Sequence, residues 1–218
     1  MKLIKIKRGR FSEIEHLNTN FKHDSLQICA TVETTNSPET YLARFPDLLF
    51  SVLKTLPNLK HHHCHTDMTP YMQRSGQIYQ FNSPLKLVGD VIDTVHLLEH
   101  VALEIQCQLD NLEACSGLTC NYWEPENRFD IFIECKNPRI AIFSFRLALR
   151  LCNAILNHEK KNMDIGEMIL LAQTINKTQI ITPEVLARKM EWPLVKVYRC
   201  MKSLEGLNFP APWWLMAA

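Results

Sequence analysis

Long apolar runs and an excess of charge of either sign are both missing from this sequence of 218 residues. No stretch reaches the ~18 apolar residues that a membrane-spanning helix needs, and the N-terminal segment MKLIKIKRGRF has no signal-peptide core. The formal net charge is +1, so the chain as a whole exerts no strong electrostatic attraction on nucleic acid or membranes. We therefore expect a cytoplasmic protein that has neither nucleic acid nor a membrane as a partner.

Cysteine pairs at metal-binding spacing are missing too. The sequence has eight cysteines, and none belongs to a Cys-x-x-Cys pair. Cysteines of a cytoplasmic protein stay reduced, so we expect free thiols, most of them small core residues, rather than a disulfide framework. Cys115 and Cys120, five positions apart, give only a weak indication of a zinc site.

What the sequence does contain is a set of clear hydrophobic patterns, with an apolar fraction of 46% that is enough for a substantial core. They predict three strands, at 2–7, 26–33 and 129–135. They also predict three longer helices, at 41–55, 90–110 and 139–157. Pro46 interrupts the first helix, and Asp90 is the expected N-cap of the second. Strands mixed with segregated helices indicate an α+β fold, a small sheet packed with helices.

Composition changes at the polar stretch NHEKKNMD, residues 157–164, which we take as a boundary. We expect a domain at 1–157 and a small all-α extension at 158–218. Short helices are expected in the extension at about 164–175, 183–190 and 194–204, with Thr182 and Pro183 starting the second.

The last two helices, with a tight turn near 191–193, have the outline of a helix-turn-helix. They carry four notable cations: Lys189, Lys196, Arg199 and Lys202. Because the total charge is near neutral and short helix pairs are common as packing units, the sequence alone favours packing over DNA binding.

The segment HLLEHVALE, residues 96–104, carries the strongest chemical signal. On a helical wheel its apolar neighbours share one face. The opposite face groups six polar or titratable residues: Asp93, His96, Glu99, His100, Glu104 and Cys107. Two neutral imidazoles four residues apart can converge on one Zn²⁺ at about 2.0–2.1 Å. A glutamate between them can act as general base, and H-x-x-E-H is the reversed zincin motif.

A catalytic zinc usually takes a third protein ligand. Glu104 lies on the same helix face, but about 12 Å of helix axis separates positions 96 and 104. Glu134, at the end of a predicted strand, is the alternative. Asp93 is placed to orient the His96 ring.

Two other interpretations compete with this site. Histidines and glutamates on one helix face often form nothing more than a solvated surface. The tract HHHCHTD, residues 61–67, is also rich in metal ligands, but adjacent loop residues point in different directions and rarely close a site alone. We expect one of its members, His62 or His63, to face the helix.

The segment HLLEHVALEIQ resembles the core motif of the N-terminal domain of cyanophycin synthetase, an enzyme that builds a polymer of aspartate with arginine side groups. Five other segments resemble parts of that domain and follow in the same order: MKLIKIKRGRF, LPNLKHHHC, SGLT, FDIFIEC and FRLALRLCNAIL. The resemblance covers about residues 1–157. Segment 66–90 departs from the family pattern, and the helices after 157 have no counterpart in it.

In some family members this domain is similar to a zinc peptidase that cuts the polymer, with the motif H-x-x-E-H-x-x-x-E. The resemblance implies that His96, His100 and Glu104 hold zinc and that Glu99 activates water, and it favours Glu104 over Glu134. Full-length members continue into an ATP-grasp domain and a Mur-ligase-like domain. Neither is seen in this sequence, so we do not expect synthetase activity.

The expected function is therefore zinc-dependent hydrolysis of amide bonds in cyanophycin or a related aspartate/arginine polymer or peptide. The alternative is a non-catalytic module that holds polymer for a separate ligase. Arg146 and Arg150, one helical turn apart, would then bind carboxylates of the polymer together with Lys136.

The C-terminal segment LNFPAPWWLMAA is unusually apolar for a chain end. We expect it to dock, either on helices of its own chain or at the interface of a homodimer.

Overall fold

The computed structural model describes residues 1–14, 17, 25–62, 91–159, 165–178 and 181–210. These residues form a four-stranded antiparallel sheet with the strand order β1-β2-β4-β3. The strands are β1 Lys2–Gly9, β2 Gln27–Glu33, β3 Gly117–Asn121 and β4 Arg128–Glu134. The helices are α1 Pro38–Thr55, α2 Val91–Asp110, α3 Pro138–Leu156, α4 Ile165–Asn176, α5 Pro183–Met190 and α6 Leu194–Gly206. Two 3-10 helices, η1 Ser12–Ile14 and η2 Pro57–His61, complete the set. The predicted α+β fold is confirmed.

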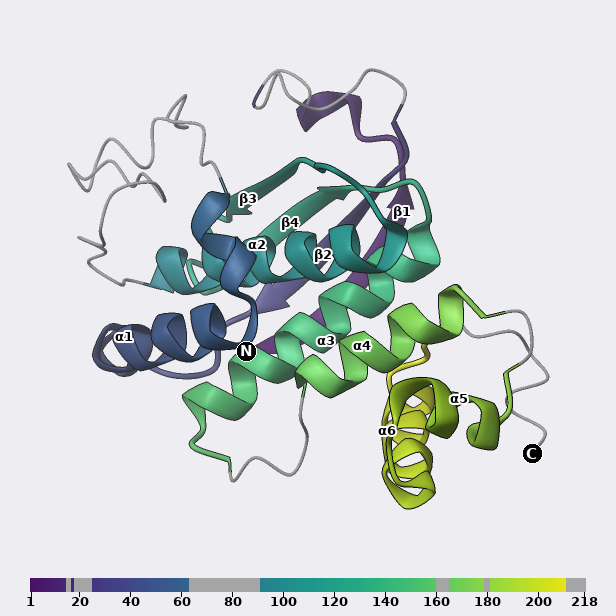
Figure 1. Ribbon diagram of the computed structural model, residues 1–218. Coiled ribbons are helices and arrows are strands. Elements are labelled where there is room, and N and C mark those ends of the chain that lie inside the picture. The colour runs from purple at the N-terminus through teal and green to yellow at the C-terminus, as the bar shows by residue number, and fades with distance from the viewer. Residues whose placement is uncertain (15–16, 18–24, 63–90, 160–164, 179–180, 211–218) are drawn as a thin grey trace.

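The two central strands of the sheet, β2 and β4, are buried along almost their whole length. Their register pairs Ile28 with Ile133 and Ala30 with Ile131, and these side chains belong to the main core. The alternate positions Cys29 and Phe132 form a small second cluster on the opposite face. Helices α2 and α3 pack across the first face (Figure 1).

Strand β3 was not predicted from the sequence. It is a five-residue edge strand whose residues are all half-buried, and it pairs only with β4 among the described strands. Such a short segment has no room for the period-two alternation that marks a strand.

The expected interruption of the first helix at Pro46 is wrong, since α1 runs without a break from Pro38 to Thr55. Pro46 lies on the exposed side of the helix, where solvent can satisfy the Leu42 carbonyl that loses its amide partner. The buried stripe continues on both sides of it and holds the helix together: Tyr41, Phe45, Leu48, Leu49 and Val52.

The expected starts and ends of the other helices are close to those observed. Helix α2 covers 91–110 as predicted, while the proposed cap Asp90 falls outside the described residues. Thr182 caps α5, accepting a hydrogen bond from the amide of Val185, and Pro183 occupies the first turn. None of the described helices is long and apolar enough to cross a membrane.

Helices α4 to α6 share the core of the sheet domain. Gln173 and Asn176 of α4 donate side-chain hydrogen bonds to the backbone carbonyls of Gln108 and Leu109 at the end of α2, each at 3.2 Å. Phe209 packs edge-to-face on Phe143 of α3, with 4.8 Å between ring centroids. The start of the apolar C-terminal segment is therefore docked on its own chain, and 211–218 lie outside the described residues. Division into two domains at 157/158 stays a prediction.

Because α4 is part of this shared core, its inward side chains should determine the stability of the whole chain. We expect Leu171→Ala, at a fully buried position, to lower the free energy of unfolding by about 2–5 kcal/mol. The adjacent Leu170→Ala, at a position that is 49% exposed, should change it by less than about 0.5 kcal/mol. Urea unfolding followed by circular dichroism measures both. Two separate transitions, with only one shifted by Leu171→Ala, would contradict a shared core.

Candidate metal centre

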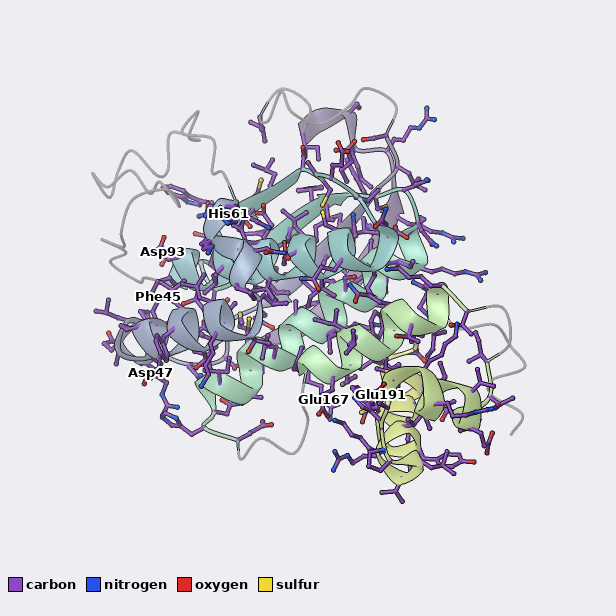
Figure 2. All side chains as sticks on the ribbon, in the orientation of Figure 1. Phe45, Asp47, His61, Asp93, Glu167 and Glu191 are labelled. Atoms are coloured by element: carbon purple, nitrogen blue, oxygen red, sulfur yellow. The ribbon has the colours of Figure 1, made fainter. Side chains whose placement is uncertain are left out.

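Helix α2 is buried on both faces, so its polar side chains lie in close contact with other parts of the protein. Its apolar face packs in the core, and the opposite face is covered by β3, β4 and η2. Four polar residues of that face are at least 95% buried: Asp93, Glu99, His100 and Glu104. Figure 2 shows His61 and Asp93 on the same side of the molecule, where η2 meets the first turns of α2. The interpretation as a merely solvated helix face is therefore wrong.

Three residues of α2 bring potential metal ligands together. One ligand atom from each of His96, Glu99 and His100 can be chosen so that all three lie within 4.8 Å of one another. The Nε2 atoms of His96 and His100 are 3.1 Å apart. Two imidazole nitrogens bound tetrahedrally to one Zn²⁺ are separated by roughly 3.3 Å, given bonds of 2.0–2.1 Å. The group can therefore hold a metal ion, and its donor types suit zinc.

Glu99 is positioned by strand β3. The Thr119 hydroxyl donates a hydrogen bond to Glu99 Oε2 at 2.5 Å. Burial raises the pKa of Glu99 to about 8, although the bond from Thr119 opposes this shift. Gly117 leaves room for the carboxylate, because a Cβ at that position would lie 2.9 Å from Glu99 Cδ and 3.0 Å from Cγ. Neither Gly117 nor Thr119 was predicted from the sequence to be a site residue.

His62, the residue that follows η2, connects two residues of α2, His100 and Glu104. Its Nδ1 lies 3.1 Å from Nδ1 of His100, and its Nε2 lies 2.9 Å from Glu104 Oε2. Gln108 donates to the other oxygen of Glu104 at 2.6 Å. The expectation that His62 or His63 faces the helix is thus confirmed for His62, while 63–67 of the histidine-rich tract lie outside the described residues.

The contacts of His62 and His100 are satisfied by an assignment of hydrogens in which each ring carries one proton. The Glu104 carboxylate can only accept, so His62 Nε2 carries the proton and His62 Nδ1 is an acceptor. His100 Nδ1 must then donate to it, which leaves the lone pair of His100 on Nε2, the atom that faces His96. A histidine that binds zinc usually donates its other ring N–H to a fixed acceptor, and here that acceptor is His62, which Glu104 holds in place.

Electrostatic effects agree with this assignment. Burial lowers the pKa of His96 to about 4 and that of His100 well below its ordinary value, so both rings are neutral near pH 7. Burial alone would raise the pKa of Glu104, but hydrogen bonds from His62 and Gln108 outweigh it and lower the pKa. Neutral imidazoles beside an ionised carboxylate are the protonation states that metal binding requires.

The predicted third ligand is not part of the compact group. Glu104 is held by His62 and Gln108, and neither it nor Glu134 belongs to the three residues whose ligand atoms cluster. Its role as a zinc ligand stays a prediction. Arg146 is half-buried and Arg150 is exposed on α3, and neither makes a described contact with the cluster. Lys136 is exposed as well, and binding of polymer by these cations also stays a prediction.

The seven described cysteines are free, as expected, and Cys64 lies outside the described residues. Cys107 and Cys115 bring their sulfur atoms to 3.1 Å near the end of α2. The spacing of Cys115 and Cys120 does not produce a metal site in the described part of the chain, where the only such group is His96, Glu99 and His100.

The family of the chain follows from a comparison with protein-family models. Residues 29–157 match the model described as the cyanophycin synthase-like N-terminal domain. The chain belongs to this family. The match includes most of β2 and the whole of α2 and α3, and with them every residue of the cluster and its supports, whereas α4 to α6 lie beyond it. The predicted resemblance is confirmed at the level of the family. A search of curated proteins found no match.

The contact of Gly117 with Glu99 gives a test of the site geometry. We expect Gly117→Ala to displace the Glu99 carboxylate and to destabilise the protein by about 1–3 kcal/mol through overpacking. Gly206→Ala is the matched control, because a Cβ there meets nothing within 4 Å. Urea unfolding of both variants checks this. Equal stability of the two would show that Glu99 does not pack against β3.

Isothermal titration with Zn²⁺ tests the role of Glu104. Removing the candidate ligand His96 with His96→Ala should abolish binding, whereas Glu104→Ala should weaken it roughly 10- to 100-fold if Glu104 acts through His62. His62→Ala should then have an effect similar to that of Glu104→Ala, because both break the same hydrogen-bond chain. Complete loss of binding in Glu104→Ala but not in His62→Ala would instead identify Glu104 as a direct ligand.

Proposed function

We propose that this protein is a zinc-dependent hydrolase that cleaves amide bonds of cyanophycin or a related aspartate/arginine polymer. The observation that carries the proposal is the convergence of the His96 and His100 Nε2 atoms beside the buried carboxyl of Glu99. The family supports the polymer as substrate, since its description links it to cyanophycin synthase.

In this proposal His96 and His100 hold zinc through Nε2, with Glu104 contributing either as a ligand or through His62. When bound, zinc supplies a Lewis acid that lowers the pKa of a coordinated water toward ~7 and polarises the amide carbonyl. His62 and Glu104 keep the lone pair of His100 on Nε2. They also prevent rotation of the ring, which fixes the direction of its donor atom.

Glu99 is proposed to move the proton. Its carboxylate takes a proton from the attacking water and returns it to the leaving nitrogen of the amide. A buried carboxyl whose pKa is raised to about 8 is basic enough for the first transfer near neutral pH. Thr119 donates a hydrogen bond to Oε2 of Glu99. This bond limits rotation of the carboxylate and so fixes the position of Oε1 as well.

The experiment combines metal analysis with a cleavage assay. Purified protein should contain zinc and should release soluble peptides from cyanophycin granules. Glu99→Gln should lower the turnover rate by about 10²- to 10⁴-fold while zinc content stays the same. Glu113→Gln, an exposed glutamate just after α2, is the control and should retain full activity.

Three results would count against the proposal. Wild-type protein without bound zinc and without cleavage would exclude the hydrolase. Binding of cyanophycin that is unaffected by Glu99→Gln, again without cleavage, would favour the polymer-binding module. Full activity of the Glu99→Gln variant would remove the proposed role of Glu99.

A further inference from the structure

Helices α5 and α6 have the geometry of a helix-turn-helix. The connection between them is three residues, Glu191 to Pro193. Glu191 adopts a left-handed conformation with φ 54°, and the Trp192 amide donates to the Ala187 carbonyl at 3.0 Å, which closes the end of α5. Both helices pack on α4, as Figure 1 shows. In helix-turn-helix proteins that bind DNA, the last helix of such an arrangement lies in the major groove.

Helix α6 has two different faces. The inner face is buried against α4 and α5 and consists of Val197, Cys200 and Leu204. The outer face is exposed and includes Val195, Tyr198, Arg199 and Lys202, with Glu205 at its C-terminal end. The first four of these positions follow the spacing i, i+3, i+4, i+7, so they form one continuous stripe along the helix. The only acidic residue on this face of α6 is Glu205, which lies in the last turn of the helix.

The composition of this stripe suits the edges and backbone of duplex DNA. Arg199 can donate two hydrogen bonds to a guanine, and Lys202 can contact a phosphate. Val195, which is 81% exposed in the first turn of α6, offers an apolar contact for a thymine methyl group. The first turn is where a recognition helix contacts bases.

Two further cations lie near the stripe, together with the exposed Glu191 of the turn. Arg188 and Lys189 are exposed in the last turn of α5, beside the turn that leads into α6. Lys196 has a different role, since it pairs with Glu167 of α4 and lies 4.0 Å from the centre of the Trp192 ring. The Lys196 side chain therefore holds α6 on α4, and the exposed cations of the outer face are Arg199 and Lys202.

We propose that the outer face of α6 is a DNA-binding surface that inserts into the major groove of duplex DNA. The near-neutral total charge argued for no nucleic-acid partner, but that total averages over the whole chain, whereas the outer face of α6 carries two exposed cations, Arg199 and Lys202. In Figure 1 helix α6 lies on the side of α4 away from the sheet, so the proposed surface is separate from the His96–Glu99–His100 group on α2. The proposal is therefore independent of the proposed hydrolase.

The test uses the full chain and a pool of labelled 30-bp duplexes with a randomised centre. Repeated selection and sequencing should enrich one motif, and the selected duplex should bind at least about 10³-fold more tightly than a scrambled one in fluorescence anisotropy. Arg199→Ala should weaken binding to the selected duplex roughly 5- to 150-fold and relax the preference at one base position. Lys202→Ala should weaken binding to both duplexes and reduce the salt dependence by about one counterion.

The control is the double variant Lys5→Ala, Lys7→Ala, which removes two exposed positive charges from β1. It should leave the affinity for the selected duplex unchanged, and circular dichroism should show all variants folded. Absence of any enriched motif would overturn the proposal. Equal losses in the control and in the α6 variants would overturn it too, because binding would then be general electrostatic attraction. A Val195→Asp variant that changes the oligomeric state, in a protein that binds no DNA, would assign the surface to a second copy of the chain.

Discussion

The burial of α2 on both of its faces is the constraint on which the rest of the structure depends. A helix with one solvated face can leave its histidines and carboxylates to water. Because β3, β4 and η2 cover this face, each buried polar group needs a partner within the protein. Thr119 meets Glu99, and His62 meets both His100 and Glu104. The candidate metal centre is thus the way in which this chain satisfies polar groups in its interior.

This dependence explains how much of the site could be predicted from the sequence. The spacing of His96, Glu99 and His100 is a property of one helix, so the periodicity of residues 90–110 was enough to bring them together. The supports come from other elements. Thr119 and Gly117 belong to an edge strand too short to show alternation, and only a resemblance drew attention to SGLT. His62 was one of two choices, because adjacent residues near the end of η2 have no periodicity that selects between them.

The fold shows the same division between local and tertiary information. Helices α3, α5 and α6 were predicted to within about two residues because caps and apolar stripes mark them locally. Pro46 was misread because its effect depends on which side of α1 faces solvent, and that is decided by packing. The contacts of Gln173 and Asn176 with α2 could not be predicted, since they join residues more than 60 positions apart.

The distance in sequence between His62 and His100, 38 residues, has a thermodynamic consequence. In the unfolded chain nothing sets the protonation of His100 or holds it beside His96, so an ion finds the assembled group only in the folded protein. Ion binding and folding are then linked equilibria. An ion present at 100 times its dissociation constant would stabilise the folded state by about 2.7 kcal/mol. Because α4 shares the core with α2, that gain would reach the helices beyond residue 157 as well.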